Sequence, residues 1–284
     1  MRAFIFSFLV IAFCLNTSSC KRSELNTDTS IAQDNNTVQS LWDDASTMVN
    51  AVSSSEILQS QSNWNNCASI HIDTLGNPFP LAFTIDFGIS NCLGADGRYR
   101  RGSLIYEISN PYQDIGTIVS VKPDDYFVDD YKVEGTRTST NNGVNGAGFL
   151  SFSIDIEDAV ITTPENETIS WSSSRVRTWM EGSETGFFTI DSINTGILGW
   201  NGVKDDVYEI TGSCKGTSRD GRSFTAVITS ALRAQLDCRW ITKGVLELQP
   251  DELRTRVFDY GNGECDADAI VTIGNKDYDI TLSR

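Results

Sequence analysis

From residue 64 onward, apolar and polar residues alternate with a period of two, and this pattern restricts the fold more than any other feature. Phe152, Ile154 and Ile156 alternate with serine and acidic residues, and the run from Phe224 to Trp240 alternates in the same way. Such alternation is typical of strands that bury one face and expose the other. Turn-forming residues separate the runs, and no helical crossover lies between them. The sequence therefore predicts an all-β fold of about a dozen antiparallel strands in a meander, arranged as a sandwich or as an open barrel or roll.

A seven-residue segment occurs twice in this β region, at Asp86–Cys92 and at Asp259–Cys265. Each copy has an aspartate, an aromatic residue, a glycine, three further residues and a cysteine, and another cysteine precedes each copy at a similar distance. We interpret this as an internal duplication with pseudo-repeated parts at about 63–182 and 205–284. In each copy the glycine would permit a sharp turn, the aromatic residue would fill the core, and the aspartate would accept a hydrogen bond from a turn amide.

A second, weaker repeat relates Val133–Thr136 to Ile210–Ser213. Each segment contains a glycine and precedes a turn and an alternating strand. The two kinds of repeat occur in opposite order in the two halves of the chain. This order favours one continuous sheet over two separate domains, with a glycine-rich joint between the halves at residues 182–204.

One helix is predicted, over residues 37–62. Val38, Leu41, Trp42, Ala45 and Met48 follow one another at steps of three and four, which places them on one face of a helix. We expect this face to pack on the sheet, and a helix that binds a partner protein is the alternative. The polar residues 20–36 before it predict a flexible tether.

The N-terminus has the pattern of an export signal. A charged start is followed by a short apolar run and then by small residues, so residues 1–19 are predicted to be a signal peptide. The apolar run is shorter than the roughly 20 residues that span a membrane. The residues before Cys20 resemble the motif at which bacterial lipoproteins are cleaved and lipidated. Lipidation of Cys20 is therefore expected, with simple secretion as the alternative.

The charge of the chain argues against several kinds of partner and site. It has 22 basic and 38 acidic residues and a net charge of −16. This charge disfavours binding to nucleic acid and to anionic membrane surfaces. Any contact with a membrane is therefore expected through the lipid alone. His71 is the single histidine, so a catalytic triad or a metal site that uses histidine is disfavoured. No catalytic residue, metal site or cofactor is predicted. Acidic loops could hold calcium, but none has the spacing of a known calcium loop, and solvated turns on an acidic protein explain them better.

The cysteines are disulfide candidates because the chain is predicted to be exported. The duplication predicts two pairs, Cys67 with Cys92 and Cys238 with Cys265, each closing a hairpin at its open end. Cys214 is then left over. We expect it to be a free, small apolar residue in a strand.

Two places in the sequence are candidates for ligand binding. The basic residues Arg98, Arg100 and Arg101 surround Tyr99 on an otherwise acidic chain. They could bind a carboxylate-bearing sugar or peptide, or they could tie a loop to neighbouring aspartates. Trp200, in the glycine-rich joint, is the tryptophan most suited to ligand contact. The candidate binding residues are therefore Arg98, Tyr99, Arg101 and Trp200.

Several segments together resemble a known group of sequences. They are TIDFGISNCLGADGRYRRGSLI (84–105), KVEGTRTSTNNG (132–143), DDVYEITGSCKGTSRDGRSFT (205–225), CRWITKG (238–244) and DYGNGECDADAIVTIGNKDYDITL (259–282). In these segments the chain resembles a family of uncharacterised lipoproteins from Bacteroidota. The resemblance implies a lipid-anchored β protein of the bacterial outer membrane, facing the periplasm or the cell surface. It implies no particular activity.

Two classes of function are compatible with the sequence. The first is a non-catalytic envelope lipoprotein whose rigid β scaffold binds a glycan or an envelope protein or serves a structural role. The second is a carbohydrate-active hydrolase, which needs two carboxylates roughly 5 to 9.5 Å apart across a cleft. The repeat makes Asp86 and Asp259 the natural pair for the second class. The absence of a nucleophile motif favours the first.

Overall fold

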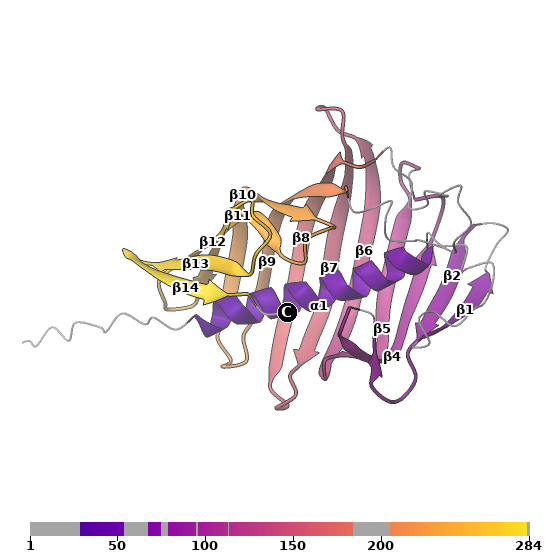
Figure 1. Cartoon of the computed structure of the whole chain (residues 1–284), viewed down its shortest axis with the longest axis horizontal. Coiled ribbons are helices and arrows are strands. Elements are labelled where there is room, and N and C mark those ends of the chain that lie inside the picture. Colours follow the sequence, from indigo (N-terminus) through magenta and orange to yellow (C-terminus); the bar gives the residue numbers. More distant parts are fainter. Residues whose placement is uncertain are drawn as a thin grey trace, which may run out of the picture.

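The described residues fold as one wide antiparallel sheet with a single helix across one face (Figure 1). The computed structural model describes residues 29–53, 68–74, 79–94, 96–112, 114–183 and 205–282. The elements are α1 (Ser30–Ser53), β1 (Ser69–Thr74), β2 (Leu81–Asp86), β3 (Cys92–Leu93), β4 (Tyr99–Ile108), β5 (Ile118–Val128), β6 (Tyr131–Val144), β7 (Leu150–Thr162), β8 (Thr168–Glu181), β9 (Val207–Thr217), β10 (Ser223–Gln235), β11 (Ile241–Pro250), β12 (Arg256–Asn262), β13 (Asp268–Ile273) and β14 (Lys276–Thr281).

The strands follow one another in the sheet in chain order, from β1 at one edge to β14 at the other, and only β3 lies off this path, paired with β4. Every pair is antiparallel, as expected of strands joined by short connections. The predicted all-β meander with one helix is therefore confirmed. Of the architectures that the sequence allowed, the structure has a single open sheet, and β8 pairs directly with β9 across the predicted joint.

Glycines in the second repeat mark places where strands bend. Gly135 in β6 and Gly212 in β9 have φ angles of +125° and +123°. A Cβ atom added to Gly135 would lie 2.8 Å from the Cα of Ala159, and one added to Gly212 would lie 2.4 Å from the carbonyl oxygen of Ser174. The strand registers shift next to both positions. Such irregularities bend strands, and they allow the sheet to curl around α1.

The helix begins at Ser30, so the prediction of a tether over residues 20–36 is wrong from residue 30 onward. The prediction failed because Asp34 and Asn35 look solvated in the sequence but are buried against the sheet. Asp34 accepts hydrogen bonds from Arg219, and Asn35 accepts one from the indole nitrogen of Trp171. The predicted packing of the apolar face on the sheet is confirmed, and the predicted residues 54–62 lie outside the described part of the chain.

The repeated Asp-aromatic-Gly segments have the structural roles expected of them. Phe87 and Tyr260 are buried in the main hydrophobic core. The carboxylate of Asp86 accepts a hydrogen bond from the amide of Gly88 at 2.8 Å, and Asp259 accepts the equivalent bond from Gly261 at 2.9 Å. Both glycines have positive φ angles. The predicted turn is present at Gly88, which follows β2, whereas Gly261 lies within β12 beside a shift in the β11–β12 register.

The disulfide between Cys238 and Cys265 is present, with the two Cα atoms 5.7 Å apart. It closes the β11–β12 hairpin at its open end, as predicted, because Cys238 lies just before β11 and Cys265 just after β12. Cys214 is free and buried, as expected. Cys92 is also disulfide-bonded, whereas its predicted partner Cys67 lies outside the described residues.

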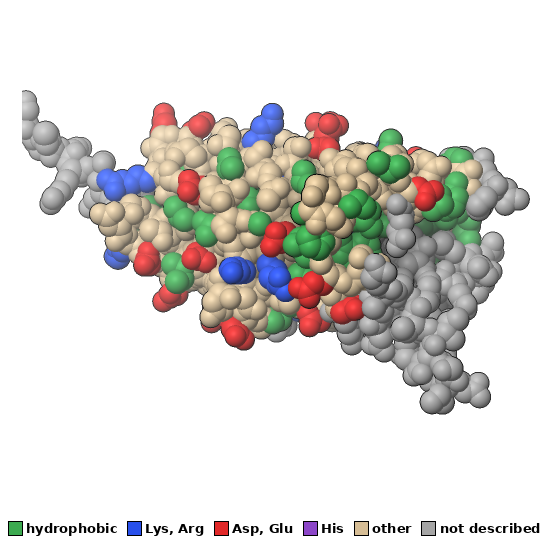
Figure 2. Space-filling view, turned by 90° about the horizontal axis from the view of Figure 1, so that it is seen from above, with side chains coloured by type: hydrophobic (Ala, Val, Ile, Leu, Met, Phe, Trp, Pro, Cys, Tyr) green, Lys and Arg blue, Asp and Glu red, His purple; other side chains and the backbone are tan. Residues whose placement is uncertain are grey.

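The surface seen in Figure 2 mixes acidic, basic and hydrophobic side chains rather than separating them. In the described part of the chain, no helix is long and apolar enough to cross a membrane. The predicted signal peptide, its cleavage site and Cys20 fall outside the described residues. Export and lipidation are therefore still predictions from the sequence.

Candidate functional site

Three arginines lie on the face of the sheet that carries α1, and we call them the arginine layer: Arg137 on β6, and Arg175 and Arg177 on β8. The registers of β6 with β7 and of β7 with β8 place all three side chains on one face, because directly opposed residues of paired strands share a face. Arg175 donates a hydrogen bond to the side-chain oxygen of Gln39 on α1. The arginine layer therefore lies between the sheet and the helix.

Arg177 packs among aromatic side chains. It donates a 2.6 Å hydrogen bond to the hydroxyl of Tyr112, and its guanidinium lies 4.6 Å from the ring centre of Tyr208 and 5.4 Å from that of Phe152. Phe152, Trp179 and Tyr208 form a small hydrophobic cluster separate from the main core. We call these three residues and Tyr112 the aromatic cluster. It closes one end of the arginine layer.

Arg175 uses only part of its hydrogen-bonding capacity. Besides its contact with Gln39, its guanidinium lies 5.3 Å from the ring centre of Trp171. The Nε atoms of Arg175 and Arg177 are buried and have no hydrogen-bond partner. Each of these N–H groups is therefore an unsatisfied donor inside the protein.

Arg137 is the least satisfied of the three. Its side chain is only 8% exposed, and among the described residues no hydrogen-bond acceptor or carboxylate pairs with it. Burial, together with the nearby charge of Arg177, lowers the pKa of Arg137 to about 10. It is therefore still a cation at neutral pH, and its charge is buried at a free-energy cost.

Six other arginines of the described chain are paired with carboxylates. Ion pairs of this kind are formed by Arg98, Arg100, Arg101, Arg219, Arg222 and Arg233. In the part of the chain that the structure describes, none of the three residues of the arginine layer forms such a pair. Acidic residues outnumber basic ones by 38 to 22, so a shortage of carboxylates does not explain the difference.

Asp43 of α1 interacts electrostatically with all three arginines of the layer. The Asp43 side chain is exposed, and both of its carboxylate oxygens lie 2.9 Å from the Nε2 of Gln39. Surrounding protein atoms still desolvate this carboxyl and raise its pKa, against the opposing effects of the Gln39 hydrogen bond and of the three arginines. Asp43 thus faces the layer without forming an ion pair with it.

Two serine hydroxyls add to the unsatisfied groups on this face. Ser139 lies two residues from Arg137 on β6, and Ser173 lies two residues from Arg175 on β8. Their side chains are 3% and 7% exposed, and neither hydroxyl has a hydrogen-bond partner. Buried hydroxyls are ordinarily bonded, so these two point to a site that a polar ligand or ordered water completes.

Asp206, beside the aromatic cluster, is a buried carboxyl. The hydroxyl of Tyr208 donates a 2.9 Å hydrogen bond to its Oδ2. Burial raises the pKa of Asp206 to about 6. The folded protein therefore binds a proton here more tightly than the unfolded chain does.

This raised pKa predicts how stability depends on pH. Stabilisation by protonated Asp206 is fully present below the ordinary pKa of an aspartate, about 4, and is lost as the pH rises through about 6. We expect the contribution to be about 1 kcal/mol, and Asp206→Asn to remove it. Urea unfolding of both proteins at pH 4, 5, 6 and 7 measures the difference between their free energies of unfolding. If this difference is the same at all four pH values, the prediction is wrong.

The cluster predicted at Arg98–Arg101 ties the structure together and does not form an open binding surface. Arg98 donates to Asp129 at 2.8 Å and to Asp44 of α1 at 3.3 Å. Arg100 is 2% exposed and pairs with Asp44 and Asp96. The structure therefore supports the second of the two interpretations offered for this cluster.

Arg101 and Tyr99, the other candidate binding residues of this cluster, also make contacts within the protein. Arg101 pairs with Asp130 and lies 3.7 Å from the ring centre of Phe127, while the exposed Tyr99 uses its backbone amide to bond Asp129. Trp200, the other candidate, lies outside the described residues. In the described part of the chain, the structure does not bring the predicted binding residues together around a site.

Asp86 and Asp259 do not form a catalytic pair. Asp86 is in β2 and Asp259 is in β12, and strands β4 to β11 lie between them in the sheet. Each carboxylate instead accepts a hydrogen bond from the amide of the glycine two residues further along the chain. The described residues also contain no group of three or more His, Cys, Asp or Glu side chains placed to hold a metal ion.

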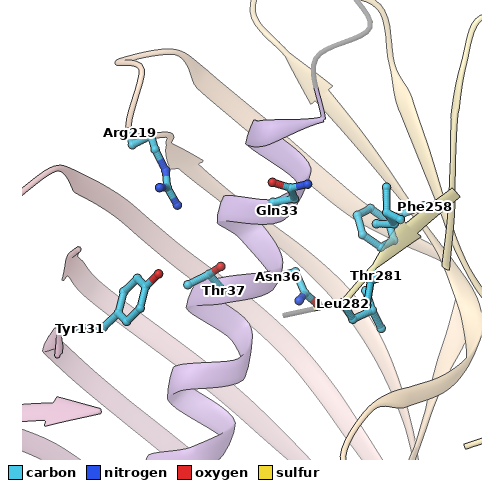
Figure 3. A pocket seen from close by; sticks show the side chains of 9 residues that line it. Gln33, Asn36, Thr37, Tyr131, Arg219, Phe258, Thr281 and Leu282 are labelled. Carbon is cyan, nitrogen blue, oxygen red and sulfur yellow. The ribbon is translucent and has the colours of Figure 1, made fainter. Parts of the chain in front are cut away.

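A cavity of about 280 Å³ lies beside the first half of α1 (Figure 3). Tyr131, Arg219, Phe258 and Leu282 contribute to its wall, together with residues of the helix. The charge of Arg219 is neutralised by Asp34, whose Oδ1 lies 2.6 Å from its Nη2. None of the described wall residues is among the buried side-chain groups without a partner, so this cavity indicates a ligand less clearly than the arginine layer does.

Comparison with protein-family models, with curated proteins and with solved structures finds no match. The functional interpretation therefore depends on the geometry of this chain. Sequence analysis missed the arginine layer, although a signal for it exists on β8. Ile169, Trp171, Arg175, Arg177 and Trp179 all lie at the inward positions of one alternating strand, where two arginines are unusual.

Proposed function

We propose that this protein is a lipid-anchored binding scaffold of the bacterial envelope, which holds a small molecule at the arginine layer between α1 and the sheet. Export, the anchor at Cys20 and the outer-membrane location come from the sequence. The binding role is supported by the geometry of β6, β8 and α1.

The main support for this proposal is the group of unsatisfied polar side chains on the inner face of the sheet, which is the face that α1 covers. Arg137 and the hydroxyls of Ser139 and Ser173 are more than nine-tenths buried and lack partners. A purely structural core would pair such groups or replace them with apolar residues, because each unsatisfied group costs about 1 to 3 kcal/mol. The exposed Asp43 indicates that solutes can reach them. Carbohydrate hydrolysis has less support, since Asp86 and Asp259 lie far apart in the sheet.

Native mass spectrometry tests whether a ligand is held on this face. Protein purified from its envelope under non-denaturing conditions is expected to carry a bound small molecule. Ser173→Phe, which fills the inner face, should remove the adduct, whereas Ser174→Phe, on the exposed opposite face of the same strand, should retain it. Ser139→Phe is a second blocking variant on β6. An adduct that persists in both folded blocking variants, or its absence from the wild-type protein, contradicts the proposal.

The anchor is tested separately. Cys20→Ala is expected to move the protein from the membrane fraction to the soluble fraction, because the lipid is its predicted membrane contact. Fractionation of cells expressing each form measures this. An unchanged membrane fraction would argue against lipidation as the cause of membrane association.

A further inference from the structure

We propose that the ligand is an organic oxyanion, whose phosphate, sulfate or carboxylate group binds Arg137, Arg175 and Arg177 and whose apolar part lies against β7 and the aromatic cluster. This inference rests on the proposed function and names the ligand class of the same site. It follows from the charge, the donors and the apolar surroundings of the layer.

The charge of the layer favours an anion. All three guanidinium groups interact electrostatically with Asp43, and Arg177 also interacts with Asp206, but none of the three has an ion-pair partner among the described residues. Asp43 is bonded to Gln39 and Asp206 to Tyr208, so neither neutralises a guanidinium by direct contact. A bound anion would supply the missing countercharge, and a neutral sugar would not.

The unsatisfied groups are donors, which also suits an oxyanion. Arg175 and Arg177 each have a buried Nε–H group without an acceptor. Arg137 has no ion-pair partner among the described residues. The hydroxyls of Ser139 and Ser173 can donate as well. Arginine forks bind carboxylates and phosphates through paired hydrogen bonds, and these are stronger than bonds between neutral groups.

The strand between the arginines supplies an apolar surface. In β7, Ile156 lies opposite Arg137, and Ile154 lies opposite Arg175. Phe152 follows opposite Arg177, where the aromatic cluster begins. A ligand that contacts all three arginines therefore also covers β7. An oxyanion attached to an aromatic or aliphatic group matches this surface better than a free inorganic ion does.

Isothermal titration calorimetry with matched probes tests this inference. Phenyl phosphate, phenyl sulfate and benzoate carry the three oxyanions on one aromatic ring, phenyl β-D-glucoside is their neutral counterpart, and inorganic phosphate lacks the ring. At least one of the three aromatic anions is expected to bind with a stoichiometry of one and more tightly than inorganic phosphate. The glucoside is expected not to bind. Added salt should weaken the binding of the anion.

Three variants test whether the anion binds at the arginine layer or at another cationic surface of the protein. Arg137→Gln is expected to weaken the binding of the anion roughly ten- to a hundred-fold, because it removes charge-assisted hydrogen bonds. Asp43→Asn keeps an acceptor for Gln39 but removes a like charge, and should strengthen binding by about three-fold. Arg101→Gln, which alters an arginine paired with Asp130 away from the layer, should leave the affinity unchanged.

The outcomes distinguish this inference from the proposed function. If the glucoside binds as tightly as the anions and Arg137→Gln has no effect, the ligand is neutral and the inference is overturned while the binding role stands. If the wild-type protein carries an adduct by mass spectrometry but binds none of the three aromatic anions, the inference is overturned in the same way. If the wild-type protein carries no adduct and binds none of the probes, both the proposed function and this inference are overturned.

Discussion

Replacing Asp44 with alanine is expected to lower the free energy of unfolding by about 3 to 5 kcal/mol, the largest effect of any substitution considered for this protein. Asp44 is a buried residue of α1 that accepts hydrogen bonds from Arg98 at 3.3 Å, from the Nε of Arg100 at 3.1 Å and from the hydroxyl of Tyr126 at 3.0 Å. Without Asp44, the buried Nε–H group of Arg100 and the buried hydroxyl of Tyr126 would lose their acceptor, and Asp96 alone would pair with the guanidinium of Arg100.

Urea unfolding of the two proteins measures this difference. Gln33→Ala is the control, because Gln33 is on the same helix and is exposed. It is expected to change the free energy of unfolding by no more than about 0.5 kcal/mol. Equal losses in the two variants would show that the ion pairs of Asp44 do not hold α1 on the sheet.

Replacing Arg137 with methionine is expected to raise the free energy of unfolding by about 1 to 3 kcal/mol and to abolish binding of the anion. Methionine fills a similar volume and removes a buried charge that has no carboxylate partner among the described residues. A residue that destabilises its own fold is typical of a functional site, where stability is lower than the core could provide.

Arg100→Met is the contrasting variant for this second prediction. Arg100 is also buried, but it is paired with Asp44 and Asp96, so the same substitution should lower the stability. Chemical denaturation measures both variants, and the calorimetric titrations measure binding. If Arg137→Met lowers the stability as Arg100→Met does, Arg137 has a structural partner and the case for a ligand there weakens.

The features that could be predicted from the sequence are those determined by near neighbours along the chain. Alternation of side chains along β7 depends on the two-residue period of a strand, which any short window of the sequence shows. The hydrogen bonds from the amides of Gly88 and Gly261 to Asp86 and Asp259 depend on residues within two positions of each glycine. The pairing of Cys238 with Cys265 could be predicted because the repeat placed the two cysteines in comparable settings.

The features that were missed depend on distant partners. Asp34 and Asn35 were assigned to a tether because their partners, Arg219 and Trp171, lie 185 and 136 residues further along the chain. The arginine layer depends on β6 and β8 being separated by one strand and covered by α1, which no local pattern encodes. Likewise, the alternation of the strands did not distinguish two packed sheets from one open sheet, because both bury one face.

The helix α1 precedes all the strands in the chain, but we expect it to dock on the sheet late in folding. Its contacts with the sheet are made by side chains, and they join residues between 54 and 185 positions apart, whereas neighbouring strands pair through short connections. Short loops close more readily than long ones, so hairpins are expected to form before α1 docks. Pulsed hydrogen exchange during refolding should then protect strand amides before helix amides. A ligand that binds during this interval would reach the arginine layer before α1 does, and the helix would close over it.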